Sequence, residues 1–246
     1  MAGGMQAGKF TPLDREPAYL KVYRAIEQNI VDGSLANGAP LPTEAELCEQ
    51  FQVTRSTVRE GLRLLEQTGL VARGSHKKFY VRRPSSADVA AAASRSLALG
   101  GVTFQEVWDA LSSYYPLAAR LATARLDQDC LDALERVRAD MGDDPGDHDK
   151  TVAGAVEFFQ IIAKGLKNRV MLAMLESLNL MVGESLRLVI SKTPKARSRI
   201  LTAQQNIIEA FRNRDQDLAE QWMAKHIADL KRGYLVAKMD INAPIL

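Results

Sequence analysis

The chain has 246 residues, of which 46% are apolar and 25% are charged, and its formal net charge at pH 7 is +2. These proportions are ordinary for a globular protein, and the length leaves room for two domains of ~100–200 residues each. No apolar run approaches the ~20 residues that a membrane-spanning helix needs, so the sequence excludes a protein built on such helices.

Two further features bear on where the protein works. Residues 1–12 contain Gly, Ala, Gln and Lys without an apolar core, so we expect a disordered N-terminus and no signal peptide. The two cysteines, Cys48 and Cys130, lie far apart and make no obvious pair. Isolated cysteines fit a reducing compartment, and we therefore expect a cytoplasmic protein.

The first predicted element is a helix over residues 19–30. Its apolar side chains recur at helical spacing: Tyr19, Val22, Tyr23, Ile26 and Ile30. We expect the helix to end at Asp32-Gly33. Pro40 and Pro42 then confine the chain to an extended connection, because a residue that precedes proline disfavours the helical region.

Residues 41–69 carry the most informative pattern, which predicts two short helices joined by a tight turn. Thr43 stands where an N-cap belongs and Glu46 follows three residues later, which is a capping box. Thr54 caps the second helix, whose apolar stripe is formed by Val58, Leu62 and Leu65.

Because this stripe faces a core, the start of the second helix is left exposed. The residues at this start are Arg55, Ser56, Thr57 and Arg59. Guanidinium donors and small hydroxyls at the start of a helix suit the DNA major groove. The segment therefore predicts a helix that contacts the bases of double-stranded DNA.

The residues that follow predict a basic hairpin. Residues 70–73 and 79–81 have the composition of short strands, and residues 74–78 form the turn between them. Eight Lys/Arg and two Glu lie between positions 53 and 83, a local charge of +6, which is the electrostatic pattern expected for phosphate contacts. A solvated basic helix face is the alternative for the charge alone. Three helices and a hairpin indicate a winged helix-turn-helix.

The motif from Leu41-Pro42-Thr43-Glu44 through Val53-Thr54-Arg55-Ser56-Thr57-Val58-Arg59-Glu60 to Gly69-Leu70 resembles the DNA-binding domain of the GntR family of bacterial regulators. The resemblance implies operator contacts by Arg55, Ser56, Thr57 and Arg59, with Thr43 at the start of the preceding helix. It also implies a wing contact by Ser75, His76 or Lys77. Two positions depart from the family: Ala45 replaces a common Arg, and Gly74-Ser75-His76 replaces a Gly-x-Gly turn.

Residues 82–86 break the pattern and mark a boundary, so we expect a disordered segment over 1–12, a DNA-binding domain over 13–84 and a second domain over 85–246. Strand signals are absent from the second domain, which predicts an all-α bundle of six or seven helices. One helix is expected to be interrupted or kinked at Pro116. The expected helices cover residues 87–99, 103–126, 127–141, 151–166, 169–192, 195–213 and 215–238.

Three stretches of the second domain resemble the FCD effector domain of the FadR-like subgroup. They are Val107-Trp108 through Pro116-Leu117-Ala118-Ala119, Phe158-Phe159 followed by Asn168, and Ile207-Ile208-Glu209-Ala210 followed by His226. The resemblance implies an effector-binding domain that also forms a homodimer.

Many FCD domains bind a divalent metal through one Asp and three His. The resemblance places these ligands at Ala155, Phe159, Gln204 and His226, so only the last is retained. Glu157 and Glu184 could replace the missing donors, but no spacing requires it. Because tight sites need three or four protein donors, we predict that the domain binds no metal.

The subgroup also commonly has an Arg and a Glu where this chain has Leu111 and Tyr115. Without them the usual means of binding a small organic acid is missing, and we expect an aromatic or acyl effector. The candidate effector-binding residues are Trp108, Tyr115, Phe159, Arg187, Gln204 and His226. The alternative is that the aromatic residues are ordinary core.

The sequence as a whole predicts a ligand-responsive transcription regulator without enzymatic activity. We expect a repressor that binds an inverted-repeat operator as a homodimer and is released by a small molecule. An architectural DNA-binding protein without an effector is one alternative. A metal-dependent α-helical enzyme with an accessory winged helix is the other, and the three scattered His residues argue against it.

Overall fold

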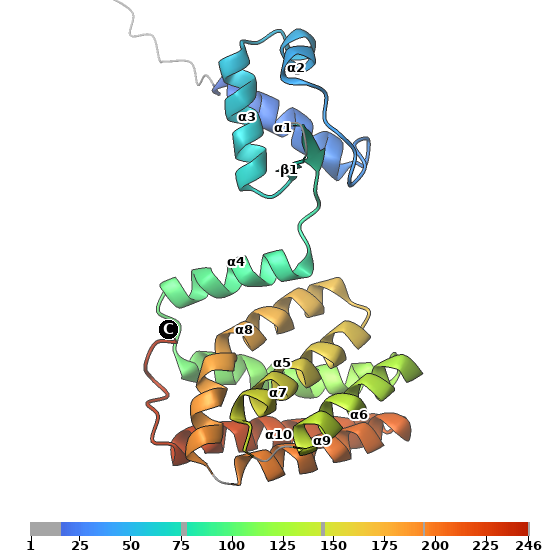
Figure 1. Ribbon diagram of the computed structural model, residues 1–246, viewed down its shortest axis with the longest axis vertical. Coiled ribbons are helices and arrows are strands. Elements are labelled where there is room, and N and C mark those ends of the chain that lie inside the picture. Colours follow the sequence, from blue (N-terminus) through green and yellow to red (C-terminus); the bar gives the residue numbers. More distant parts are fainter. Residues whose placement is uncertain (1–15, 75–77, 144–145, 194, 246) are drawn as a thin grey trace, which may run out of the picture. The chain divides into compact units, whose positions relative to one another are not determined.

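The computed structural model describes residues 16–74, 78–143, 146–193 and 195–245, apart from the side chains of residues 142, 143 and 184. The chain divides into two compact units, Met1–Pro84 and Ser85–Leu246 (Figure 1). The structure is mainly helical, with one two-stranded sheet in its first unit, as the sequence predicted. None of the described helices is long and apolar enough to cross a membrane.

The first unit contains three helices and a hairpin. The helices are α1 (Ala18–Val31), α2 (Glu44–Phe51) and α3 (Arg55–Gln67), and the strands are β1 (Val71–Arg73) and β2 (Phe79–Val81). A small core joins all five elements through Val22, Ile26, Ile30, Leu47, Val58, Leu62, Leu65, Val71 and Val81. Winged helix-turn-helix architecture is therefore confirmed for this unit.

Local chemistry accounts for the helix-turn-helix. Thr43 and Glu46 form the predicted capping box at the start of α2. The helix ends at Gln52, which adopts the left-handed conformation (φ 53°) that ends many helices. Thr54 then caps α3 by accepting a hydrogen bond from the amide of Thr57. The turn is therefore only three residues long.

A further extended segment pairs with the wing, which the sequence did not indicate. β1 and β2 pair antiparallel, with Val71 opposite Val81 and Arg73 opposite Phe79. Residues 38–41 run along the other side of β2, where the Leu41 amide donates to the carbonyl of Phe79 at 2.8 Å. The expected extended connection therefore ties the start of α2 to the wing.

In the residues that the structure describes, the second unit is a bundle of seven helices, in agreement with the predicted six or seven. They are α4 (Ser86–Leu99), α5 (Phe104–Thr123), α6 (Gln128–Asp143), α7 (His148–Gly165), α8 (Arg169–Lys192), α9 (Ala196–Arg212) and α10 (Gln216–Val236). Helix α10 packs against α5 and α9, α7 packs against α6 and α8, and α4 packs on α8 (Figure 1). One continuous apolar core runs through the bundle.

Two helices differ from expectation. Helix α5 stays continuous through Pro116. Proline leaves the carbonyl four residues earlier without its helical donor, but that residue, Ser112, is exposed, so water can satisfy the carbonyl. Helix α7 begins before residue 151 because Asp147 caps it, accepting a hydrogen bond from the amide of Lys150 at 2.8 Å.

Candidate functional sites

The start of α3 presents a cluster of hydroxyls around its cap. The Thr54 hydroxyl lies 2.9 Å from the hydroxyls of both Ser56 and Thr57. Arg55 and Ser56 are exposed and Thr57 is half-buried. The cap therefore holds the two predicted hydroxyl contacts in place and leaves the Arg55 side chain in solvent.

Three arginines follow one face of α3. Arg55, Arg59 and Arg63 are four residues apart, which places their side chains in one row along the helix. The Arg59 Nε donates to Glu44 Oε2 of α2 at 2.8 Å, while the Arg55 guanidinium has no partner among the described residues. Ion pairs as exposed as this one contribute ~0–1 kcal/mol, so Arg59 can leave Glu44 for a base or a phosphate.

Thr43 has a different role from the arginines. Its amide donates to Glu46 Oε2 at 2.7 Å and its hydroxyl to the same oxygen at 2.8 Å. The hydrogen bond from the Thr43 amide also lowers the pKa of the Glu46 carboxyl. Thr43 therefore fixes the beginning of α2, whose free amides remain available for an anion.

A groove lies between α3 and the wing. It is lined by Glu44, Arg59, Glu60, Leu62, Arg63, Arg73 and Phe79. The Arg73 guanidinium lies over the ring of Phe79, 5.0 Å from its centroid. The sequence had not singled out Arg63 or Arg73, although their positions one turn after Arg59 and directly before the wing turn were a signal. The predicted wing contacts Ser75, His76 and Lys77 lie outside the described residues.

The second unit contains an internal aromatic cavity between α5, α7, α8 and α10. It is lined by Trp108, Leu111, Tyr115, Val156, Phe159, Asn179, Val182, Leu186, Ile227, Leu230 and Tyr234. The Tyr115 hydroxyl donates to Asn179 Oδ1, and burial raises the pKa of Tyr115 above its usual value. Trp108, Tyr115 and Phe159, predicted from separate stretches, are thus brought together. Asn179 and Tyr234 were missed.

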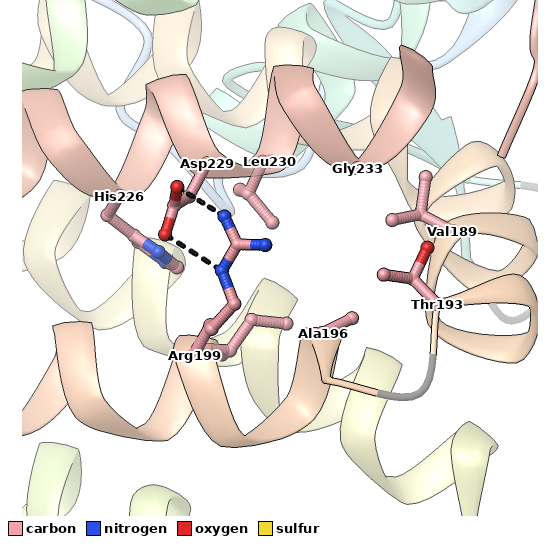
Figure 2. A pocket seen from close by; sticks show the side chains of 9 residues that line it. Val189, Thr193, Ala196, Arg199, His226, Asp229, Leu230 and Gly233 are labelled. Carbon is pink, nitrogen blue, oxygen red and sulfur yellow. Dashed lines mark hydrogen bonds and ion pairs between the residues drawn. The ribbon is translucent and has the colours of Figure 1, made fainter. Parts of the chain in front are cut away.

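His226 lies at the edge of this cavity. Its imidazole stacks on the ring of Phe159, with centroids 5.4 Å apart and planes inclined by 13°. Burial lowers the pKa of His226 to about 4, so the ring is neutral at pH 7. His226 also lines a second cavity beside Arg199 and Asp229, which form an ion pair (Figure 2).

The other two predicted effector residues lie elsewhere. Gln204 of α9 is fully buried, and neither its amide nitrogen nor its oxygen has a partner among the described residues. Arg187 forms an ion pair with Asp149 in a groove on α7 and α8, and Glu157 lines the same groove. The structure therefore does not bring Arg187 to the aromatic cavity.

The residues around His226 do not fit a metal ion. Phe159, at a position where the FCD resemblance implies a ligand, covers a face of the imidazole with a ring that has no donor atom. Ala155 is buried and contributes only a methyl group. Across the described ranges, no three side chains of His, Cys, Asp or Glu are grouped as metal ligands would be.

The first unit is a winged helix-turn-helix with a row of exposed arginines, an arrangement suited to DNA, and the second is a helical bundle with an internal cavity. Comparison with known proteins specifies the family. Residues 18–81 match "Bacterial regulatory proteins, gntR family", and residues 115–229 match the FCD domain. The chain therefore combines a DNA-binding domain of the gntR type with an FCD domain.

Relatives agree with this assignment. The chain is 31% identical over 130 residues to the uncharacterized HTH-type transcriptional regulator Rv0494 of Mycobacterium tuberculosis, a match that covers 52% of this chain and 54% of that protein. The chain thus spans about half the length of this relative. It is 28% identical to the HTH-type transcriptional repressor NanR of Cronobacter sakazakii, over 88% of this chain and 85% of that protein.

A solved structure, "Streptococcus agalactiae GntR", shares the fold. It superposes with a TM-score of 0.66 at 24% sequence identity and covers 87% of this chain and 99% of its own.

Proposed function

We propose that this regulator is a homodimeric repressor that binds an inverted-repeat operator and is released by a small-molecule effector. The row of Arg55, Arg59 and Arg63 on the exposed face of α3 is the observation that carries the proposal. Arginine binds guanine O6 and N7 in the major groove with two hydrogen bonds. Two such helices related by a two-fold axis would read two half-sites.

The remaining contacts follow from the same face. We assign base or backbone contacts to Arg55, Ser56, Thr57 and Arg59, and a supporting role to Thr43. The groove that contains Arg63 and Arg73 suits a phosphate backbone passing between α3 and the wing. Ser75, His76 and Lys77 complete the proposed interface at the wing.

The effector is proposed to bind the aromatic cavity. Trp108, Tyr115 and Phe159 line this cavity, and His226 borders it. Gln204 does not line the cavity but stays a candidate, because its buried amide has no partner among the described residues. Arg187 lies in a separate groove and is left out. Effector binding is expected to lower operator affinity through a coupling of ~1–3 kcal/mol.

The relative NanR, which matches 88% of this chain, is a transcriptional repressor, and this supports repression. The names of the relatives also support a protein without catalytic activity. We place the protein in the cytoplasm, where its DNA target lies and where Cys48 and Cys130, which are not disulfide-bonded, stay reduced.

Selection of bound DNA from a random duplex library at near-physiological salt tests the proposal. Enrichment of a short inverted repeat would support a dimeric, specific regulator. Affinity for the selected duplex should then fall steeply with salt, because phosphate contacts release counterions. Binding that is salt-sensitive but blind to sequence would instead indicate an architectural protein, and no binding would refute the proposal.

A further inference from the structure

The residues that line the aromatic cavity restrict the charge of a ligand that can bind there. None of the described residues that line it carries a charge. A carboxylate placed there would lose its hydration without gaining a cation, which is strongly unfavourable. Arg199 lines the neighbouring cavity, where it is already paired with Asp229. The cavity therefore disfavours an organic acid.

Two of the polar groups on the residues that line the cavity are donors without a partner among the described residues. Trp108 and Asn179 are each 2% exposed, and the Trp108 Nε1 and the Asn179 Nδ2 have no acceptor among the described residues. The Asn179 oxygen already accepts from the Tyr115 hydroxyl, and the Tyr234 hydroxyl is bonded to Ser185. Buried donors are nearly always satisfied in folded proteins, so these two N–H groups call for an acceptor.

A ligand larger than water needs side chains to move. The centre of a water molecule can reach about 20 Å³ of the aromatic cavity and about 20 Å³ of the second one, enough for a single water in each. A cavity that holds benzene measures ~150 Å³. A ring must therefore displace side chains such as Leu230, which lines both cavities.

We propose that the aromatic cavity binds a neutral aromatic compound whose carbonyl oxygen accepts hydrogen bonds from Trp108 and Asn179. The ring of this compound would pack among Tyr115, Phe159 and Leu230. The inference rests on the proposed function in that it names the chemical class of the effector.

Three probes of similar shape test the inference on the full chain by thermal unfolding. Acetophenone has the carbonyl and no charge, benzoate adds a charge, and ethylbenzene lacks the acceptor. Acetophenone is expected to raise the melting temperature in a saturable manner, because a ligand that binds only the folded state stabilises it. Benzoate and ethylbenzene should have much smaller effects.

Two variants locate the binding. Trp108→Phe keeps an aromatic side chain and removes the Nε1 donor, so it should weaken acetophenone about tenfold and leave ethylbenzene unchanged. Trp222→Phe is the matched control, because Trp222 lies on α10 outside the cavity with Lys225 over its ring. Asn179→Leu should also abolish the preference for acetophenone over ethylbenzene.

Equal or stronger stabilisation by benzoate, or no stabilisation by any probe, would overturn the inference and indicate that an internal water satisfies the two donors. Release of the selected operator duplex separates this result from the proposed function. Binding of acetophenone without release of the operator would support the inference on the cavity's ligand. It would contradict the proposal that this cavity binds the effector. Release of the operator by organic acids but not by acetophenone would support the proposed function and refute the inference.

Discussion

The ring of Phe159 lies parallel to the imidazole of His226, with the two centroids 5.4 Å apart. The FCD resemblance implies two metal ligands at these positions, and here one of them has become an apolar partner of the other. Burial then lowers the pKa of the remaining imidazole to about 4. The same pair of positions thus contributes to an apolar core.

Restoring the missing donors should restore metal binding. The variant Ala155→Asp, Phe159→His and Gln204→His would supply four donors together with His226, which is enough for a tight Zn²⁺ site. We expect substoichiometric metal in the tag-free parent protein and stoichiometric Zn²⁺ in the variant, measured by mass spectrometry of the metal. Adding His226→Ala should weaken this site. Stoichiometric metal in the parent protein would contradict our reading of the pocket.

The stability of the second unit should depend on pH through His226. Its pKa is about 4 in the folded state, and the unfolded value is ~6.5, so below pH 6.5 only the unfolded state binds the proton. Stability is therefore retained above pH 6.5 and lost as the pH falls towards 4. Linkage predicts that the free energy of unfolding decreases by about 2 kcal/mol between pH 7 and pH 5.

Urea unfolding at several pH values measures this dependence. The variant His226→Gln should lose the slope between pH 7 and pH 5 while retaining the steeper loss below pH 5 that carboxylates cause. His148 lies at the start of α7 and is exposed, so His148→Gln serves as the control. The same slope in His226→Gln and in the parent protein would show that His226 is not the titrating group.

Arg55 should contribute directly to operator recognition. Its guanidinium is exposed and has no partner among the described residues, so its removal leaves the fold intact. Arg55→Ala is expected to weaken operator binding by ~1–3 kcal/mol, about 5- to 150-fold, and to relax one base preference. Fluorescence anisotropy with the selected duplex and its single-base variants measures both effects.

Arg136→Ala is the control for this substitution, because Arg136 is exposed on α6 in the other unit. It removes the same charge and should leave operator affinity nearly unchanged. Equal affinities of Arg55→Ala and the parent protein would place the recognition surface elsewhere.

The sequence predicted what depends on local spacing. The capping box joins Thr43 to Glu46, three residues later, and is visible in the sequence. The helical spacing of apolar side chains, which predicted the helices, is visible there too. The Arg59–Glu44 ion pair joins two helices and depends on the turn between them. Trp108 and Asn179 line one cavity only because α5 and α8 pack together. Arg187 pairs with Asp149 of another helix and does not line the aromatic cavity, and spacing along one helix could not show this pairing.

The Arg59–Glu44 ion pair should set how well the regulator distinguishes its operator from other DNA. Glu44→Gln removes a negative charge beside the DNA-facing arginines, so affinity for random duplex is expected to rise about two- to fivefold, equivalent to ~0.5–1 kcal/mol. The freed Arg59 side chain is also less well oriented, so the ratio of operator to random affinity should fall. Glu49→Gln, with the same charge change on the exposed part of α2, is the control. A ratio unchanged by Glu44→Gln would show that the pair does not orient Arg59.

Gly61 should determine how closely α3 packs on α1. A Cβ atom at this position would lie 2.9 Å from the Val22 Cγ1 and 3.1 Å from the Tyr19 carbonyl oxygen. Alanine normally stabilises a helix by ~1 kcal/mol relative to glycine, but overpacking of a core costs ~1–3 kcal/mol. Because one of the two contacts is with backbone, we expect Gly61→Ala to lower the stability of the first unit by about 1 kcal/mol.

Val22→Ala removes the Cγ1 atom that the new Cβ at position 61 would approach most closely. Introduced alone, this substitution leaves a small cavity. The double variant should therefore be less destabilised than the sum of the single variants, which a double-mutant cycle of urea unfolding measures. Gly33→Ala is not a suitable control because Gly33 has a positive φ of 88°. Additive effects of Gly61→Ala and Val22→Ala would show that α1 and α3 adjust their spacing freely, and the position of the arginine row would then not depend on Gly61.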